Sequence, residues 1–227
     1  MELINISREE QINLIKLVIE NIIVQNKVLM NRLQKITNQP AQLDSGYIGQ
    51  HLVSIVTKIK GGGFRGKGLD LSDGSEIKTA NFLDSLDAHN QVAPRWNFQA
   101  NSREDIDSFL KYPAIYLVSI DNPIDCYRFR IWKTIPQNTT ILKERYLEWI
   151  DKLAIEKLKS RQGINFQLFP PKPSENDRKA MARHGNGRNN GFAKLEIPLE
   201  DDASSLILLA KYKLLTQQTM IEYLIEN

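Results

Sequence analysis

The sequence has a single cysteine, Cys126, among its 227 residues. One cysteine excludes an internal disulfide and is typical of a protein from a reducing compartment, so we expect the protein in the cytoplasm. No apolar run approaches the roughly 20 residues that a membrane-spanning helix needs. The N-terminus, MELINISREEQ, lacks the basic region of a secretory signal. These absences favour a globular protein whose stability comes from a packed core.

Charge and hydropathy are close to the average for globular proteins. Apolar residues make up 41% and charged residues 25% of the chain. The net charge is +3 and the isoelectric point is near 8.8. This mild basicity permits a nucleic-acid partner without demanding one. The length suffices for one large domain with a sizeable core.

The segment from Gly68 to Thr79, GLDLSDGSEIKT, has the pattern of a tight β-hairpin. Asp73-Gly74 is a strong two-residue turn signal, because a type I′ turn needs positive φ at its centre. The spacing predicts a short strand over Leu69–Leu71 and a returning strand over Ser75–Ala80. Side chains alternate along a strand, so residues of both arms can meet on one face at a sheet edge.

Three side chains suited to catalysis lie in this hairpin: Asp70, Glu76 and Lys78. Two converging carboxylates repel each other unless a cation lies between them. Hard oxygen ligands with room for water suit Mg²⁺, and a neighbouring lysine can orient a water and stabilise negative charge. The set therefore fits metal-assisted hydrolysis of a phosphodiester. The alternative is a surface hairpin in which Glu76 and Lys78 form an ordinary ion pair.

The order of elements around these residues resembles the PD-(D/E)XK nuclease superfamily, in particular its type II restriction endonucleases. The resemblance covers roughly residues 45 to 170. It implies an α/β (α+β) fold with a restriction-endonuclease-like core, a central mixed sheet flanked by helices. It also implies that Asp70 is the first acid, Glu76 the second and Lys78 the lysine. By the same resemblance, a Mg²⁺ ion would be held by Asp70, Glu76 and the carbonyl oxygen of Ile77.

The segment Gly46–Leu52, GYIGQHL, is similar to the start of the first helix of that core. Several relatives carry a glutamate on this helix as an extra metal or water ligand. This helix offers Gln50, His51 and Ser54 instead, so the sequence does not predict a second metal site. Leu69 stands where the superfamily often has a proline before the first acid.

Helical periodicity predicts one long helix from Arg8 to Ile36, and the capping box of Ser7 and Glu10 marks its start. This helix either packs on the core or joins two subunits, since palindromic DNA sites are commonly bound by two-fold symmetric proteins.

We divide the chain into the N-terminal helix (1–40), a nuclease core (41–171) and a C-terminal part (172–227) that forms one structural domain with the core. On one strand of the core, Arg128 and Arg130 are expected on an outer, solvated face. In chain order, the patterns predict a helix at Ser45–Lys58, strands at Ala114–Ile120 and Cys126–Lys133, a helix at Thr140–Lys159, a strand at Ile164–Phe169 and a helix at Ser204–Ile225.

Three stretches offer side chains suited to contacts with DNA. The first is a glycine-rich loop at Lys60–Gly68, which carries three basic side chains. The second is Asn81–Arg103, which has amide and arginine side chains but no periodic element. The third is Arg178–Lys194, which is basic and contains no acidic residue. The alternatives are a flexible solvated loop, a structured loop anchored by Trp96, and a mobile basic connector. The candidate DNA contacts are Lys60, Arg65, Lys67, Arg95, Asn97, Arg183, His184, Asn186, Arg188, Asn189 and Asn190.

The residues and the resemblance together predict a type II restriction endonuclease. The resemblance implies a homodimer on duplex DNA, Mg²⁺-dependent cleavage that leaves a 5′-phosphate and a 3′-hydroxyl, and a bacterial or archaeal cytoplasmic location. It also implies a cognate DNA methyltransferase, as a separate protein of the same system. The alternatives are a structure-specific repair or recombination nuclease of the same superfamily and a DNA-binding protein without catalysis.

Overall fold

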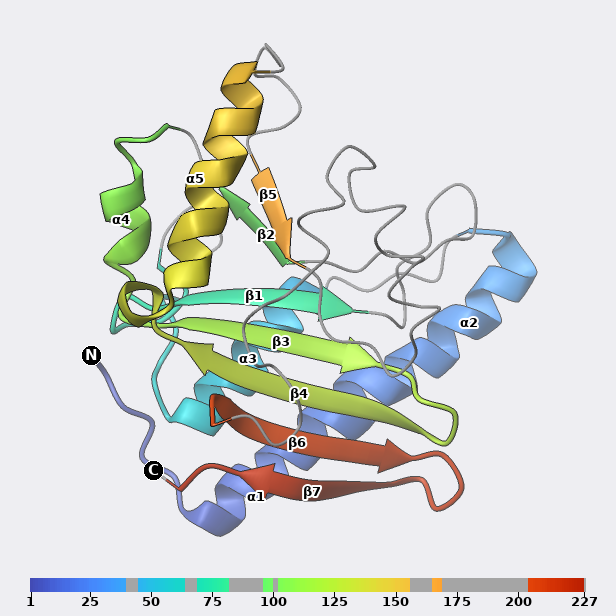
Figure 1. The fold of residues 1–227 in the computed structure, drawn as a ribbon. Coiled ribbons are helices and arrows are strands. Elements are labelled where there is room, and N and C mark those ends of the chain that lie inside the picture. The colour runs from blue at the N-terminus through green and yellow to red at the C-terminus, as the bar shows by residue number, and fades with distance from the viewer. Residues whose placement is uncertain are drawn as a thin grey trace.

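A five-stranded mixed sheet forms the centre of the molecule, and helices flank it (Figure 1). The computed structural model describes residues 1–39, 45–63, 69–81, 96–99, 102–155, 165–168 and 204–226. The sheet contains, in spatial order, β1 (Glu76–Asn81), β3 (Ile115–Asp121), β4 (Cys126–Thr134), β6 (Leu206–Lys213) and β7 (Gln218–Leu224). β1 and β3 are parallel and all other neighbours are antiparallel. The predicted α/β fold with a mixed sheet is therefore confirmed.

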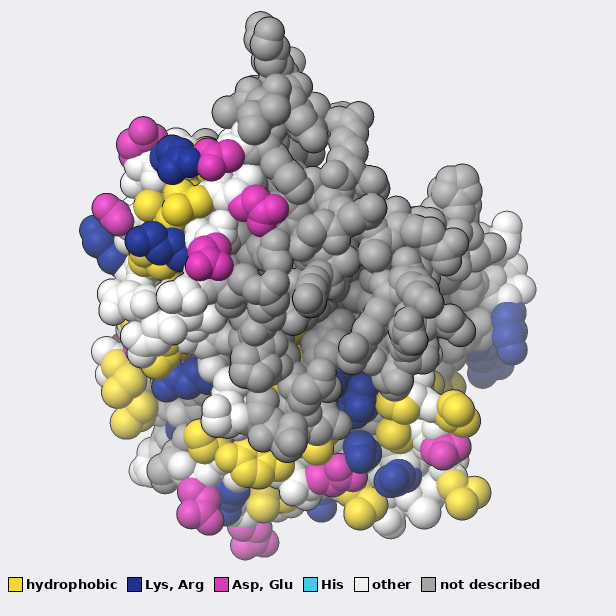
Figure 2. Space-filling view, in the orientation of Figure 1, with side chains coloured by type: hydrophobic (Ala, Val, Ile, Leu, Met, Phe, Trp, Pro, Cys, Tyr) yellow, Lys and Arg dark blue, Asp and Glu magenta, His cyan; other side chains and the backbone are white. Residues whose placement is uncertain are grey.

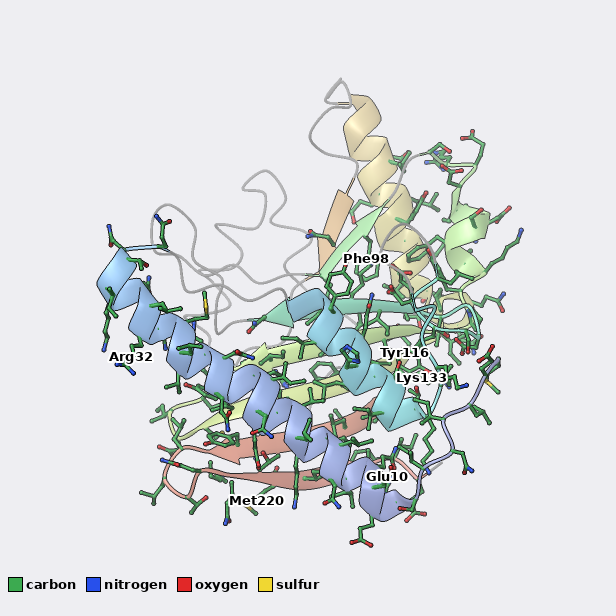
Figure 3. The ribbon with its side chains drawn as sticks, turned by 180° about the vertical axis from the view of Figure 1, so that it is seen from behind. Glu10, Arg32, Phe98, Tyr116, Lys133 and Met220 are labelled. Carbon is green, nitrogen blue, oxygen red and sulfur yellow. The ribbon has the colours of Figure 1, made fainter. Side chains whose placement is uncertain are left out.

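The N-terminal helix is continuous and crosses one face of the sheet diagonally (Figures 1 and 3). Its first turn is capped by Ser7, whose side chain accepts a hydrogen bond from the main-chain N–H of Glu10 at 3.1 Å. It ends at Asn38, which adopts the left-handed conformation with φ of 58°. The sequence does not predict its π-helical middle. Its three parts are α1 (Arg8–Leu17), η1 (Val18–Val24) and α2 (Gln25–Thr37).

The first face of the sheet packs against α1, η1 and α3 (Ser45–Thr57). The apolar side chains of η1 and α3 are buried here because their helical spacing turns one stripe toward the strands. In contrast, no residue of α2 is buried. This core includes Ile15, Ile19, Ile23, Leu52, Val53, Val56, Ile77, Tyr116, Val118, Ile131 and Leu208.

The second face of the sheet carries an aromatic core. Trp96 is fully buried, lies edge-on to Trp132 with ring centroids 6.1 Å apart, and donates its indole N–H to the carbonyl of Val118 at 2.8 Å. Trp96 is therefore a packing anchor, as the structural alternative for its segment predicts. The elements around this core are β2 (Trp96–Gln99) with its antiparallel partner β5 (Asn165–Leu168), α4 (Ile106–Leu110), η2 (Pro136–Asn138) and α5 (Thr140–Ile155).

The predicted C-terminal helix at Ser204–Ile225 is wrong. The segment forms the hairpin β6–β7, closed by a turn in which Gln217 has a φ of 55° and donates its N–H to the carbonyl of Lys213 at 2.9 Å. Leucine, alanine, lysine and glutamine favour helices in isolation, but β6 pairs with β4 along its length and buries its first five residues. Tertiary pairing therefore overrides local propensity.

Two further expectations need correction. The stretch Asn81–Arg103 does contain a periodic element, the short strand β2, whose side chains alternate between buried and exposed through Trp96, Asn97 and Phe98.

Arg128 and Arg130 are not solvated: their side chains are only 12% and 2% exposed, and both are bound to the buried carboxylate of Asp121. Sequence alternation places a residue on a face of the sheet but does not reveal what covers that face.

The structure confirms the predicted helix at Ser45–Lys58 and the predicted strands at Ala114–Ile120 and Cys126–Lys133, and it describes α5 as far as Ile155. The predicted strand at Ile164–Phe169 is present as Asn165–Leu168, which pairs with β2 outside the five-stranded sheet. The outer edge of β7 is protected, because Glu20 accepts the Thr219 N–H at 2.9 Å and Arg8 donates to the Leu224 carbonyl at 2.7 Å. None of the helices within the described ranges is long and apolar enough to span a membrane.

Candidate active site

The predicted hairpin is present, but its turn differs from the prediction. A three-residue loop at Ser72, Asp73 and Gly74 connects Leu71 to Ser75, and the Leu71 N–H donates to the Ser75 carbonyl at 3.2 Å. Gly74 has a φ of 92°, as the last residue of such a loop needs, so the turn is not type I′. The carboxylate of Asp73 accepts the Ser75 N–H at 2.9 Å and stabilises the loop from within.

The first arm of the hairpin is shorter than expected. Instead of a strand over Leu69–Leu71, a single bridge joins Leu71 to Gly61. The segment 58–61 in turn pairs with the N-terminus, because the Ile4 N–H donates to the Lys58 carbonyl at 2.7 Å and the Lys60 N–H to the Glu2 carbonyl at 2.9 Å. The arm that carries Asp70 is therefore supported by two neighbouring segments.

Asp70 is held by hydrogen bonds to both of its carboxylate oxygens. Its Oδ1 accepts from Gln50 Nε2 of α3 at 2.6 Å, and its Oδ2 accepts from the main-chain N–H of Ile77 in β1 at 2.8 Å. The two donors come from different elements, so the carboxylate is fixed against both the helix and the edge strand. A carboxylate oxygen accepts more than one bond, so each can still bind a cation.

Glu76 and Lys78 lie two residues apart on β1 and form a short ion pair on the same face of the strand. Their side chains are 14% and 26% exposed. Burial raises the pKa of Glu76; the adjacent Lys78 ammonium offsets part of this rise, and the negative charge of Asp70 adds to it. The Asp70 carboxylate contacts the main chain of Ile77, the residue between Glu76 and Lys78, at 2.8 Å. The structure thus brings the three predicted catalytic residues together.

The main chain of Ile77 is directed toward the outer edge of the sheet. In β1 the Glu76 N–H donates to the Ala114 carbonyl, toward β3. Successive residues of a strand direct their main-chain groups to opposite sides, so the groups of Ile77 point away from β3, where its N–H meets Asp70. The Ile77 carbonyl therefore lies on the same side as Asp70. Among the described strands, β1 lies at the edge of the sheet, and none of them pairs with it on this side.

The donor set at this edge comprises two carboxylates and one carbonyl. Within the described parts of the chain, no group of three or more His, Cys, Asp or Glu side chains could hold a metal ion. A cation bound by Asp70, Glu76 and the Ile77 carbonyl would therefore complete its coordination with water or substrate oxygens. Few protein ligands, all of them hard oxygens, suit Mg²⁺ better than a metal that needs a full protein cage.

Close contact between α3 and β1 positions the site. A Cβ at Gly49 would lie 2.0 Å from Thr79 Oγ1, so only glycine fits at this crossing. Because Gln50 follows Gly49 directly, the close approach brings its amide within reach of Asp70. The sequence segment GYIGQHL contains this glycine, but only the packing reveals its role.

Tyr112 is a neighbour of the site that sequence reasoning missed. Burial raises the pKa of its hydroxyl, and the negative charges of Glu76 and Asp70 raise it further. Its ring lies edge-on to Phe109 of α4 with centroids 6.3 Å apart. Nothing in the local sequence marks Tyr112, because its proximity depends on the pairing of β1 with the start of β3, where the Glu76 N–H donates to the carbonyl of Ala114, two residues after Tyr112.

Two of the candidate DNA contacts are described. Lys60 is exposed and forms an ion pair with Glu2 at 3.3 Å, and Asn97 is exposed on β2. Over α4 and α5, Figure 2 shows basic side chains interspersed with acidic ones, and Arg103 pairs with Asp151 there. That surface is therefore not a continuous basic tract. The candidates outside the described residues are Arg65, Lys67, Arg95, Arg183, His184, Asn186, Arg188, Asn189 and Asn190.

A mixed sheet flanked by helices, with an acid–acid–lysine hairpin at its edge, is consistent with a restriction-endonuclease-like core. The chain belongs to the MamI restriction endonuclease family, whose model matches residues 32–210. It is also similar to the type II restriction enzyme MamI of Microbacterium ammoniaphilum, with 31% identity over 192 residues. That alignment covers 76% of this chain and 58% of the relative, so the chain spans less than two thirds of that protein. No solved structure matches the chain.

Proposed function

We propose that the protein is a type II site-specific deoxyribonuclease of the PD-(D/E)XK superfamily. It would hydrolyse phosphodiester bonds within a short duplex sequence in a Mg²⁺-dependent reaction. The observation that supports this proposal most is the convergence of Asp70, Glu76 and Lys78 at the edge strand β1. Membership of the MamI restriction endonuclease family agrees with it.

Asp70, Glu76 and the carbonyl oxygen of Ile77 would hold the Mg²⁺ ion. When bound, this ion supplies a Lewis acid that neutralises charge on the phosphate and lowers the pKa of a water molecule. Asp70 enters the reaction already oriented by its bonds to Gln50 and Ile77. Glu76, partly buried, is costly to ionise without a nearby positive charge, and Lys78 supplies one.

Lys78 would orient the attacking water and stabilise the developing charge. An ammonium group has three donors, and in Lys78 one of them is directed at Glu76. Another can be directed at the water or at a non-bridging phosphate oxygen. The water oxygen would form a bond to phosphorus and release a proton to the solvent, the bond from phosphorus to the 3′ oxygen would break, and a proton from the solvent would bind to that oxygen. The products are a 5′-phosphate and a 3′-hydroxyl.

The proposal extends to partners. The basic and amide-rich candidates, such as Lys60, Asn97 and Arg188, would contact phosphates or base edges of duplex DNA. A homodimer would place two such sites on the two strands, and a separate methyltransferase would protect the host DNA. Cytoplasmic location stays a prediction that follows from the same assignment.

Digestion of unmethylated phage DNA tests the proposal. The purified protein is incubated with Mg²⁺, with EDTA, and as the Lys78→Ala variant. Lys133→Ala is a matched control, because Lys133 is an exposed lysine of the same sheet, on β4, facing away from the Glu76–Lys78 side. We expect discrete fragments from the wild type and from Lys133→Ala with Mg²⁺, and intact DNA in the other two lanes.

The remaining outcomes separate the alternatives. Intact linear DNA together with cleavage of branched substrates would indicate a structure-specific nuclease. Binding that survives EDTA, with no cleavage of any substrate, would indicate a DNA-binding protein without catalysis. Fragments from Lys78→Ala at the wild-type rate would remove the lysine from the mechanism.

A further inference from the structure

An uncharged polar side chain of helix α3 binds the Asp70 carboxylate of the hairpin directly. Of the polar residues Gln50, His51 and Ser54, the first donates its amide to Asp70 Oδ1 at 2.6 Å. His51, the next residue of the helix, is exposed. The contact of Gln50 with Asp70 joins residues 20 positions apart, so the fold and not the local chain creates it.

The bond from Gln50 completes the orientation of the Asp70 carboxylate. The Ile77 N–H alone holds only Oδ2, which leaves the carboxylate able to rotate about its Cβ–Cγ bond. The second donor, on Oδ1, removes this freedom. Groups that orient a ligand in this way are worth roughly 10- to 100-fold in metal affinity when they are removed.

Because the Gln50 amide is uncharged, it adds no negative charge beside the two carboxylates of the site. A glutamate at position 50 would place a third carboxylate in contact with Asp70, where a donor now stands. Without a cation, two carboxylates at that distance repel each other strongly. Glutamine keeps the orienting contact while the number of negative charges at the edge of β1 stays at two.

We propose that Gln50 is a positioning residue, whose amide holds Asp70 in the orientation that binds a divalent cation and limits the site to one such ion. This inference rests on the proposed function, because it takes Asp70 as a metal ligand. Two observations support it: the amide contacts the carboxylate directly, and the tight crossing of α3 over β1 at Gly49 and Thr79 fixes the position of the residue.

Mn²⁺ binding to the full chain without DNA tests the inference, because Mn²⁺ takes the same oxygen ligands as Mg²⁺. The signal of free Mn²⁺ in electron paramagnetic resonance gives its affinity and stoichiometry. Gln50→Met keeps the length of the side chain but removes the donor, Gln50→Glu adds the third carboxylate, and His51→Ala is the exposed control on the same helix. Thermal unfolding in EDTA identifies any variant that is not folded.

For Gln50→Met we expect Mn²⁺ affinity to fall about 10- to 100-fold, with one ion still bound and an unfolding temperature in EDTA near that of the wild type. For Gln50→Glu we expect a lower unfolding temperature in EDTA and tighter binding or a second bound ion. His51→Ala should match the wild type in both measurements.

Two results would overturn the inference in distinguishable ways. If Gln50→Met binds Mn²⁺ as tightly as the wild type while Asp70→Asn does not bind it, the cation site stands and Gln50 has no part in it. If Asp70→Asn binds Mn²⁺ as tightly as the wild type, Asp70 is not a metal ligand. The proposed function then fails together with the inference, and it fails likewise if the wild type itself binds no Mn²⁺. If Gln50→Met proves unfolded, an unchanged affinity and stoichiometry in folded Gln50→Glu also rejects the role.

Discussion

Substitution of Gly49 by alanine tests how closely α3 must approach β1. The added Cβ would lie 2.0 Å from Thr79 Oγ1, 3.1 Å from its Cβ and 3.2 Å from its Cγ2. Carbon atoms in contact are normally about 3.5–4.0 Å apart, so the helix must retreat by more than an ångström or Thr79 must rotate. Rotation removes the Oγ1 clash but leaves the tight contact with the Cβ of Thr79. The variant is therefore overpacked in either case.

The expected magnitude follows from three terms. Overpacking a core contact costs about 1–3 kcal/mol. Retreat of α3 also lengthens the 2.6 Å bond between Gln50 and Asp70 beyond the hydrogen-bonding range, a loss of about 1 kcal/mol. Replacing a glycine inside a helix by alanine stabilises the folded protein by about 1 kcal/mol, which offsets part of this loss. We expect Gly49→Ala to lower the free energy of unfolding by about 1–3 kcal/mol, and to weaken Mn²⁺ binding as the loss of the Gln50 amide does.

Urea denaturation measures this loss, and a double-mutant cycle with Thr79→Ala identifies its cause. Because Thr79→Ala removes the two outer atoms of the clash, Gly49→Ala should cost less in that background, by a coupling energy of about 0.5–3 kcal/mol. A Gly49→Ala variant as stable as the wild type, or a coupling energy of zero, would refute the close approach of α3.

Two further predictions concern the sheet. Asp121→Asn should destabilise the protein by about 3–5 kcal/mol in urea titrations, because it leaves Arg128 and Arg130 buried without their carboxylate; an unchanged midpoint would contradict that buried ion pair. Cys126 is 5% exposed and burial raises the pKa of its thiol, so less of it is thiolate at pH 8 and its native reaction with an aromatic disulfide reagent should be slow. Denaturant should accelerate this reaction, and an equally fast native reaction would place Cys126 at the surface.

The candidate site was predictable because its signals are local. Asp70, Glu76 and Lys78 lie within nine residues, and a glycine-containing turn brings the two arms of a hairpin together whatever the rest of the chain does. The details of the turn were not predictable, since three-residue and two-residue loops use the same residue types. The long N-terminal helix could also be predicted, from its capping residues and the spacing of its apolar residues.

The C-terminal hairpin was missed for a physical reason. The first part of β6, LILLA, is covered on both faces of the sheet, so its apolar residues do not alternate with polar ones. A run of that kind does not distinguish a buried strand from a buried helix, and the lysines and glutamines that follow favour a helix. What decides the structure is pairing with β4, some 80 residues earlier in the chain.

Contacts between segments that are distant in the chain could likewise not be predicted from the sequence. The helix residue Gln50 was visible as a departure from the superfamily pattern, yet nothing local predicts that its amide reaches Asp70. Tyr112 and the ion pairs of Asp121 belong to the same category. In each case the functional or stabilising contact depends on which elements the tertiary fold brings together.

The position of the candidate site follows from the topology of the sheet. β1 pairs with β3 in parallel, and no other strand in the described ranges pairs with β1, so the main-chain groups of Ile77 remain available to Asp70 and, in our proposal, to a cation. Glu76 and Lys78 are in register with Ile115 and Leu117, whose side chains belong to the aromatic core of the second face. The chain between β1 and β3 supplies part of that core, through β2 and α4. The same connection that makes parallel pairing possible therefore also covers part of the face on which Glu76 lies. Burial of Glu76 explains why its ionised carboxylate depends on Lys78 or, in our proposal, on a bound cation.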